Sequence, residues 1–308
     1  MSVTLIAVVV ALVIGHTLPA LASLRRYDWY VSWLDWLGRQ LGDQPFWRGP
    51  WGLAIALVVP LLVVGLLQLG LRDDLLGLPA FVFALAMLFY AWGPRDLDHD
   101  VDAVVEAPDA ASREVAAKRL FPERDAAGGE PPSMESGALV EATFRCALWR
   151  WFGVLFWFLL LGPFGALLYR LVALSAQGEA RQRLPEGAAS AARTSLALLD
   201  WPVAQLMTLA MALVGNFDSV LSAWKDAGGA SLRADTGFLA AAARASVRHE
   251  MAQDAFEDMG TDYVPDTTTA TLALPELAEL RDAMSLVWRI LLLWLAVLAL
   301  FVVAGWVT

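Results

Sequence analysis

The sequence predicts an all-α, polytopic integral membrane protein. Hydrophobic residues make up 58% of the 308 residues and charged residues only 18%, and the mean hydropathy is +0.55. A soluble globular domain carries less apolar and more charged material. The apolar residues gather in long uncharged runs, which satisfy their own backbone hydrogen bonds in lipid by forming helices. No strand-like alternation and no internal repeat is visible, so residues 1–308 are predicted to form a single polytopic membrane domain.

Four runs are long enough and apolar enough to cross a bilayer. Residues 51–71 and 76–93 are apolar and uncharged, and residues 151–170 are uncharged up to their final arginine. Residues 285–307 contain only Arg289, near their start, where a long side chain can reach the interface. We therefore expect these four runs to be membrane helices.

Two further runs are interrupted by polar residues and prolines. Residues 3–24 contain His16, and residues 195–217 contain Asp200 and Pro202. Each run either spans the bilayer or enters it as a helix sheltered by its neighbours. The expected total is therefore four to six membrane segments.

The remaining sections, 94–150 and 218–284, show helical spacing of apolar residues separated by Gly- and Pro-rich loops, so they are predicted to be soluble helical sections. Arginines are concentrated in 23–50 and 94–150, which places these segments on the cytoplasmic side of a bacterial inner membrane. Section 218–284 is expected on the same side, although the sidedness of 171–284 depends on whether both weaker runs span.

Charge and cysteine content narrow the possible partners. The net charge of −10 lies mainly in the soluble sections, which would repel nucleic acid and anionic lipid headgroups. The expected partner is therefore the lipid bilayer and not nucleic acid. The single cysteine, Cys146, excludes an internal disulfide and a cysteine-based metal cluster and is interpreted as a buried thiol.

One candidate cation site lies at the start of section 94–150. Asp96, His99 and Asp100 are spaced at i, i+3 and i+4, which places them on one helical face, and such a set can bind a divalent cation. The alternative, which we favour, is an acidic first turn stabilised by the helix dipole. The sequence does not identify a metal or any other cofactor.

A second candidate site is a polar pocket formed by Tyr169, Arg170, Asp200 and His16. Ionisable groups within apolar runs are costly in a membrane and often functional. Arg170 and Asp200 could pair across the helix bundle and form the floor of such a pocket. The alternatives are a purely structural ion pair, or separate interfacial positions, and for His16 a capped place at the membrane edge.

Other conspicuous side chains are given structural interpretations. Arg181 and Arg193 are expected to form an edge facing solvent or lipid phosphates. Many of the 14 tryptophans lie near the ends of the apolar runs, as in an interfacial aromatic belt.

Two short motifs carry a family resemblance. The run GPFGALLYR at 162–170 resembles the G-x-x-G-A-x-x-Y-R element of the membrane cobinamide synthases (CobD/CbiB) and their relative AmpE. The run LLDWPV at 198–203 resembles the LDW-[VI]-P element of that superfamily, and residues 213–224 resemble an AmpE segment that ends in Ala-Trp. The order of apolar and polar segments also fits across most of the chain.

A departure from the synthase pattern favours the AmpE family. The synthases carry a polar E-N-T-S-D run before the span, whereas this chain has TFRCALWR at 143–150. The acids that could hold Mg²⁺ for an ATP-dependent ligation are therefore missing, and no P-loop is present.

The resemblance thus implies an inner-membrane regulatory protein without established catalysis. It would act with components of the anhydro-muropeptide amidase pathway in β-lactamase induction and the response to β-lactams. A membrane enzyme of the synthase type with a degenerate acidic site stays open as an alternative. A small-molecule channel or transporter is the second alternative.

Overall fold

The protein is built from helices, as the sequence predicts. The computed structural model describes residues 25–71, 78–93, 97–121, 134–231, 233–258 and 277–304, and these residues contain no strand. The helices, in chain order, are α2 (Asp28–Leu41), α3 (Pro45–Arg48), α4 (Trp51–Gly70), α5 (Leu78–Ala91), α6 (Leu97–Val105), α7 (Ala110–Ala117), η2 (Lys118–Leu120), α9 (Ser136–Ala147), η3 (Leu148–Phe152), α10 (Gly153–Leu161), α11 (Pro163–Ala176), α12 (Gly178–Arg183), α13 (Glu186–Val214), α14 (Phe217–Asp226), α15 (Gly237–Asp258) and α16 (Ala278–Val303).

Four helices are long and apolar enough to cross a membrane: Trp51–Gly70, Ser136–Leu161, Glu186–Val214 and Ala278–Phe301. The first and last correspond to the predicted spans 51–71 and 285–307, and the third contains most of the weaker run 195–217. The chain is therefore a multi-pass membrane protein by the length and composition of its helices. The other weaker run, 3–24, lies outside the described residues.

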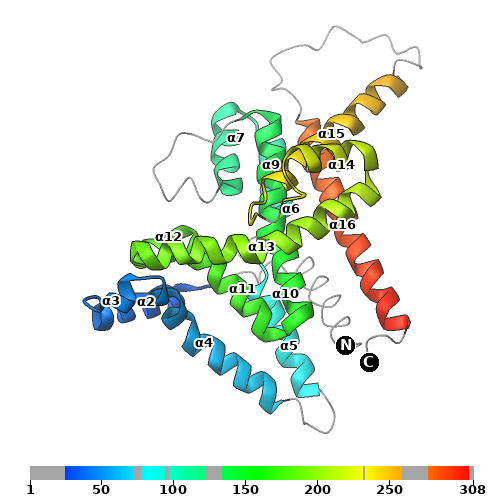
Figure 1. Ribbon diagram of the computed structural model, residues 1–308. Helices are drawn as coiled ribbons and strands as arrows, with labels where there is room; N and C mark the ends of the chain where they lie inside the picture. The colour runs from blue at the N-terminus through cyan, green and yellow to red at the C-terminus, as the bar shows by residue number, and fades with distance from the viewer. Residues whose placement is uncertain are drawn as a thin grey trace.

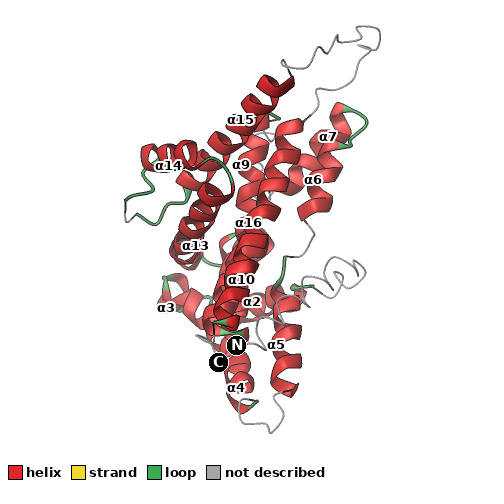
Figure 2. Cartoon of the chain, turned by 90° about the vertical axis from the view of Figure 1, so that its right-hand side faces the viewer, coloured by secondary structure: helices red, strands yellow, loops and turns green. Residues whose placement is uncertain are grey.

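The helices form two groups on either side of α13. In Figures 1 and 2, α4, α5, α10 and α11 lie at one end of the molecule, and α6, α7, α9, α14 and α15 lie at the other. Helix α13 crosses the long α9–α10 helix between these groups (Figure 1). Asp200 of α13 meets Tyr169 and Trp149 near this crossing.

The predicted span 151–170 is wrong, because a sharp turn divides it into two helices. Helix α10 ends at Leu161, Gly162 has a φ of 71°, and α11 begins at Pro163 and returns along α10. A positive φ suits glycine, which has no Cβ, and proline suits the first turn of a helix because its missing N–H needs no partner there. The helix that is long enough to span begins instead at Ser136. Residues 136–150, which were assigned from the sequence to the section 94–150, are continuous with α10 in this helix.

Gln68 of α4 closes this turn. Its Nε2 donates to the Leu161 carbonyl oxygen at 3.1 Å, and its Oε1 accepts from the Phe164 N–H at 2.9 Å. One amide side chain therefore satisfies the end of α10 and the start of α11. Such pairing is essential in an apolar environment, where an unsatisfied backbone group costs several kcal/mol, about 2–7 by transfer data.

The predicted span 76–93 contains a shorter helix than expected. Helix α5 has 14 residues, which at a rise of about 1.5 Å per residue gives about 21 Å. The hydrocarbon core of a bilayer is about 30 Å thick. Helix α5 is therefore classed with α11 as a short apolar helix and not with the four long ones.

Some of the described tryptophans are exposed and others are buried. Trp29, Trp36 and Trp51 expose between 42% and 70% of their surface near α2 and the start of α4, as interfacial aromatic residues do. Trp47 and Trp151 are buried and are part of the packed core. The exposed tryptophans are compatible with the predicted interfacial belt, whereas the buried ones belong to the packed core.

Candidate functional site

Asp200 of α13 is held by two side chains from other helices. Its Oδ1 accepts a hydrogen bond of 2.6 Å from the Tyr169 hydroxyl of α11, and its Oδ2 accepts one of 2.9 Å from Trp149 Nε1. Asp200 and Tyr169 are buried. A buried carboxylate is costly unless its oxygens are hydrogen-bonded, and here both oxygens are. The carboxylate is therefore fixed in one orientation.

Local chain geometry brings these groups together. Trp149 lies in η3, a π-helical turn between α9 and α10, and such turns shift the register of side chains and occur often at functional sites. Pro202 lies inside α13, two residues after Asp200, and has no N–H to donate to the preceding turn. Close by, the Leu199 carbonyl oxygen accepts a hydrogen bond of 3.2 Å from Trp157 Nε1. Two hydrogen bonds, from Trp149 to Asp200 and from Trp157 to the Leu199 carbonyl oxygen, thus join this part of α13 to the α9–α10 helix.

A polar cavity of about 380 Å³ opens beside Asp200. Helix α13, the joint between α11 and α12, the π-helical turn and the loop before α15 supply its walls. Its lining residues are Trp149, Ala176, Gln177, Gly178, Arg181, Arg193, Leu196, Ala197, Asp200, Ala234, Asp235 and Thr236. Its volume lies within the range of small-molecule sites, about 300–1,000 Å³.

The opposite face of α13 is apolar. Four leucines of this helix, Leu198, Leu206, Leu209 and Leu213, expose between 41% and 64% of their surface. Three of them line an apolar groove of about 420 Å³ between α10, α13 and α16. Helix α13 therefore separates a polar cavity on one face from an apolar surface on the other.

Arg170 does not join Asp200 in this cavity but caps α5. Its Nε donates to the Ala91 carbonyl oxygen at 2.6 Å, and its Nη2 donates to the Arg150 carbonyl oxygen at 3.5 Å. The last carbonyls of a helix have no partner within the helix, and cations near them are favourable. Tyr169 and Arg170 are consecutive on α11, so their side chains leave the helix in different directions, one toward α13 and the other toward α5.

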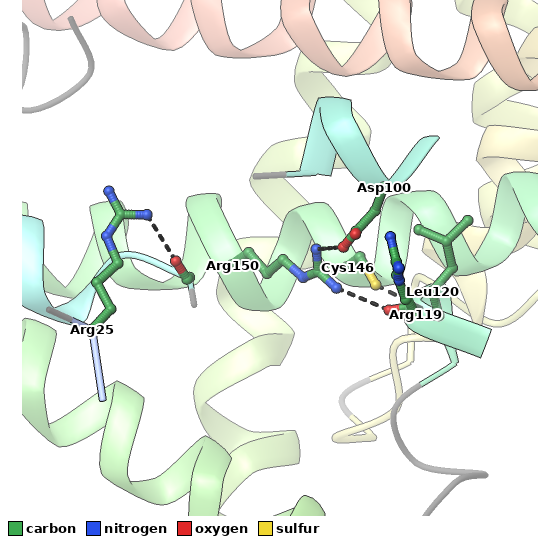
Figure 3. A network of polar contacts seen from close by, with 7 residues as sticks. Arg25, Asp100, Arg119, Leu120, Cys146 and Arg150 are labelled. Carbon is green, nitrogen blue, oxygen red and sulfur yellow. Dashed lines mark hydrogen bonds and ion pairs between the residues drawn. The ribbon is translucent and has the colours of Figure 1, made fainter. Parts of the chain in front are cut away.

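Two residues that precede α2 cap the same end of α5. The Tyr27 hydroxyl donates to the Tyr90 carbonyl oxygen at 2.6 Å, and Arg25 Nη1 donates to the Gly93 carbonyl oxygen at 2.9 Å (Figure 3). Burial raises the pKa of Tyr27, so its hydroxyl keeps the proton that it donates. Arg170, the last residue of the family-like motif, is thus part of a helix cap that secures α5.

The predicted cation site is not assembled by the described residues. Asp96 lies outside them, His99 is exposed, and the buried Asp100 forms an ion pair of 2.6 Å with Arg150 Nη1 (Figure 3). Arg150 also donates to the Arg119 carbonyl oxygen at 3.0 Å. The described part of the chain contains no group of three or more His, Cys, Asp and Glu side chains that could hold a metal ion. Asp100 thus anchors α6 to the π-helical turn.

The remaining residues singled out in the sequence have the following positions in the structure. His16 lies outside the described residues. Cys146 is buried and its thiol donates to the Leu120 carbonyl oxygen at 3.4 Å (Figure 3). Arg181 and Arg193, which the sequence assigned to an outer edge, line the cavity beside Asp200.

Sequence reasoning missed the contributions of Trp149, Arg150 and Gln177. In the stretch 143–150, the family resemblance drew attention to the missing acids and not to Trp149 or Arg150. A signal was present, however, because Trp149 and Arg150 are polar-tipped side chains within an otherwise apolar run, where such groups need partners. Gln177 has no comparable signal, because its place depends on the joint between α11 and α12.

In comparisons with known proteins, no protein-family model, no curated protein and no solved structure matched the chain.

Proposed function

We propose that this chain is a regulatory protein of the bacterial inner membrane, of the kind that AmpE represents, and that the cavity beside Asp200 is its ligand site. In this role it acts with components of the anhydro-muropeptide amidase pathway and modulates β-lactamase induction. The four long apolar helices support the membrane setting. The family-like motifs at 162–170 and 198–203 support the regulatory role, as a resemblance.

The observation that carries the proposal is the fixed carboxylate at the edge of a polar cavity. Asp200 is buried, accepts hydrogen bonds from Tyr169 and Trp149, and still lines a space of about 380 Å³. Ionisable groups in apolar helices are costly and mark functional sites. A carboxylate held in one orientation can recognise a hydroxyl or ammonium group of a ligand without losing side-chain entropy on binding.

Each oxygen of Asp200 accepts one hydrogen bond from this chain and keeps a further lone pair that a ligand donor can use. The cavity's polar lining also faces only one side of α13, since the groove on the other side is apolar. No observation on the described residues favours the synthase-type enzyme or the transporter over a binding protein.

Deletion and complementation test the proposal. The gene is deleted from its host, and β-lactam-induced β-lactamase activity is compared after complementation with wild type, Asp200→Asn or Asp218→Asn. Asp218 is an exposed acid in the first turn of α14, away from the cavity, so it is the matched control. We expect deletion to change induction, and wild type and Asp218→Asn to restore it. Asp200→Asn should fail to restore it at equal membrane levels.

Two results would overturn the proposal. Induction that is unchanged by the deletion would remove the regulatory role. Restoration by Asp200→Asn as complete as that by wild type would remove the cavity from the function.

A further inference from the structure

Two hydrogen-bond donors in the cavity beside Asp200 have no acceptor. The Nε2 atom of Gln177 is buried and has no hydrogen-bond partner. Arg181 also lines this cavity, and among the described residues its guanidinium has no ion pair or hydrogen bond. Buried donors in native proteins are nearly always satisfied, so each exception calls for an explanation.

Two neighbouring arginines form ion pairs with acids of the chain, whereas the Arg181 guanidinium forms none among the described residues. Arg183, two residues along the same helix, pairs with Asp35 at 3.3 Å and with Glu179 at 3.2 Å. Arg193, on the opposite wall of the cavity, pairs with Glu186 at 2.9 Å. Arg181 is half-buried and lines the cavity, and its guanidinium forms no ion pair with an acid among the described residues.

The joint between α11 and α12 positions these two donors. Gly178 has a φ of +67°, and nothing lies within 4 Å of the place where its Cβ would be. The positive φ turns the chain at the end of the enclosed helix α11, so that Gln177 and Arg181 both line the cavity. The open space at Gly178 leaves room for a ligand to approach the backbone.

We propose that the cavity binds its ligand through a carboxylate or phosphate group, which accepts hydrogen bonds from the Arg181 guanidinium and the Gln177 amide. The inference rests on the proposed function, in which this cavity is the ligand site. Arginine's planar fork matches carboxylate and phosphate oxygens, and such charge-assisted bonds are about twice as strong as neutral ones.

The acids of the cavity define the rest of the ligand. Asp200 and Asp235 line the same space and would repel a molecule that was anionic throughout. They favour hydroxyl or ammonium groups at the end of the ligand away from Arg181. The ligand class is therefore a small molecule with one anionic group at one end and hydrogen-bond donors at the other.

Binding measurements on the full chain test this inference. The protein is placed in nanodiscs of phosphatidylcholine, which has no net charge, and its thermal unfolding is followed at constant ionic strength with added inorganic phosphate, sn-glycerol 3-phosphate, acetate or L-glutamate. Nanodiscs that also contain phosphatidylglycerol form a separate arm, which distinguishes a lipid headgroup from a soluble ligand. We expect at least one anionic probe to stabilise the wild-type protein in a concentration-dependent way.

Matched variants assign the effect to the two donors. Arg181→Gln and Gln177→Glu should weaken the response by at least about tenfold, because each removes or opposes a charge-assisted hydrogen bond. Arg183→Gln, on the same short helix but outside the cavity, should respond as wild type does. A response in phosphatidylglycerol nanodiscs alone, lost in Arg181→Gln, would identify the anion as a lipid headgroup.

The inference is overturned if no soluble probe and no anionic lipid stabilises the protein. It is also overturned if Arg181→Gln and Arg183→Gln respond alike. These outcomes are distinguishable from failure of the proposed function. β-Lactamase induction can depend on Asp200 when no anion binds, and an anion can bind through Arg181 when induction does not change.

Discussion

The Asp100→Asn substitution examines how burial sets the strength of an ion pair in this protein. Asp100 and Arg150 pair at 2.6 Å, and their side chains are only 4% and 11% exposed. Glu141 and Arg145 pair at the same distance of 2.6 Å, but their side chains are 30% and 43% exposed. Both arginines lie on the long helix that begins at Ser136. The two pairs therefore share a distance and differ in burial; the Glu141–Arg145 pair also lies within one helix, and Glu141 makes a second contact of 3.7 Å with Arg244 Nη1.

The two pairs should respond very differently to the loss of the acid's charge. Asp100→Asn removes the charge that pairs with the buried Arg150 guanidinium, and breaking a buried pair in this way costs about 3–5 kcal/mol. Glu141→Gln leaves Arg145 in contact with solvent, which screens its charge, and exposed pairs contribute about 0.2–1 kcal/mol. The double variant Asp100→Leu/Arg150→Met should recover much of the loss, because it removes both buried charges.

SDS-induced unfolding in dodecylmaltoside micelles, followed by tryptophan fluorescence, measures these differences. We expect Asp100→Asn to unfold at a clearly lower SDS fraction than wild type, and Glu141→Gln to unfold within error of wild type. Equal effects of the two substitutions would refute the reasoning that burial, and not distance, decides the strength of these pairs.

Three further substitutions can be measured in the same assay. Gly153→Ala should destabilise the protein by about 1–3 kcal/mol, because its Cβ would overlap the buried Tyr169 ring. Gly137→Ala on the same long helix meets only ordinary contacts and should be neutral or slightly stabilising; equal effects would show that Tyr169 is not tightly packed. Tyr169→Phe should cost about 1–3 kcal/mol, because one oxygen of Asp200 loses its donor, and a neutral result would contradict that bond. Gln68→Leu should lower stability by a similar amount, because it leaves a carbonyl and an N–H at the turn unpaired; wild-type stability would mean that other groups satisfy the turn.

The long spans could be predicted from the sequence because hydropathy and length are sufficient for them. Residues 51–71 correspond to α4 within one residue at its end, since an uncharged run of this length has no stable alternative in lipid. The division of 151–170 could not be predicted in this way. Its composition is equally apolar on both sides of Gly162, and the turn is completed by Gln68, which is distant in the sequence.

The candidate site was predictable only in part. The two residues Tyr169 and Asp200 meet, because both are polar groups within apolar helices and each needs a partner. The Arg170–Asp200 pair suggested by opposite charges is not the arrangement found, because Arg170 follows Tyr169 on α11 and is directed to the end of α5. Tyr169 and Arg170 are consecutive, so the rotation of α11 about its axis decides which of them faces Asp200. Opposite charges in the sequence do not reveal that rotation.

Helix α13 separates a polar cavity from an apolar surface, and we expect water to reach the cavity and lipid to cover the apolar surface. Two consecutive residues test this separation directly. Ala197 lines the cavity, whereas Leu198 is 61% exposed on the apolar face. The single native thiol, Cys146, is first replaced by alanine, and Ala197→Cys and Leu198→Cys are then made separately in that background. Their labelling by a charged, membrane-impermeant methanethiosulfonate reagent is compared in liposomes opened to both sides. We expect rapid labelling of the cysteine at 197 and little labelling of the cysteine at 198. Equal or reversed labelling would contradict the separation of a polar and an apolar face by α13.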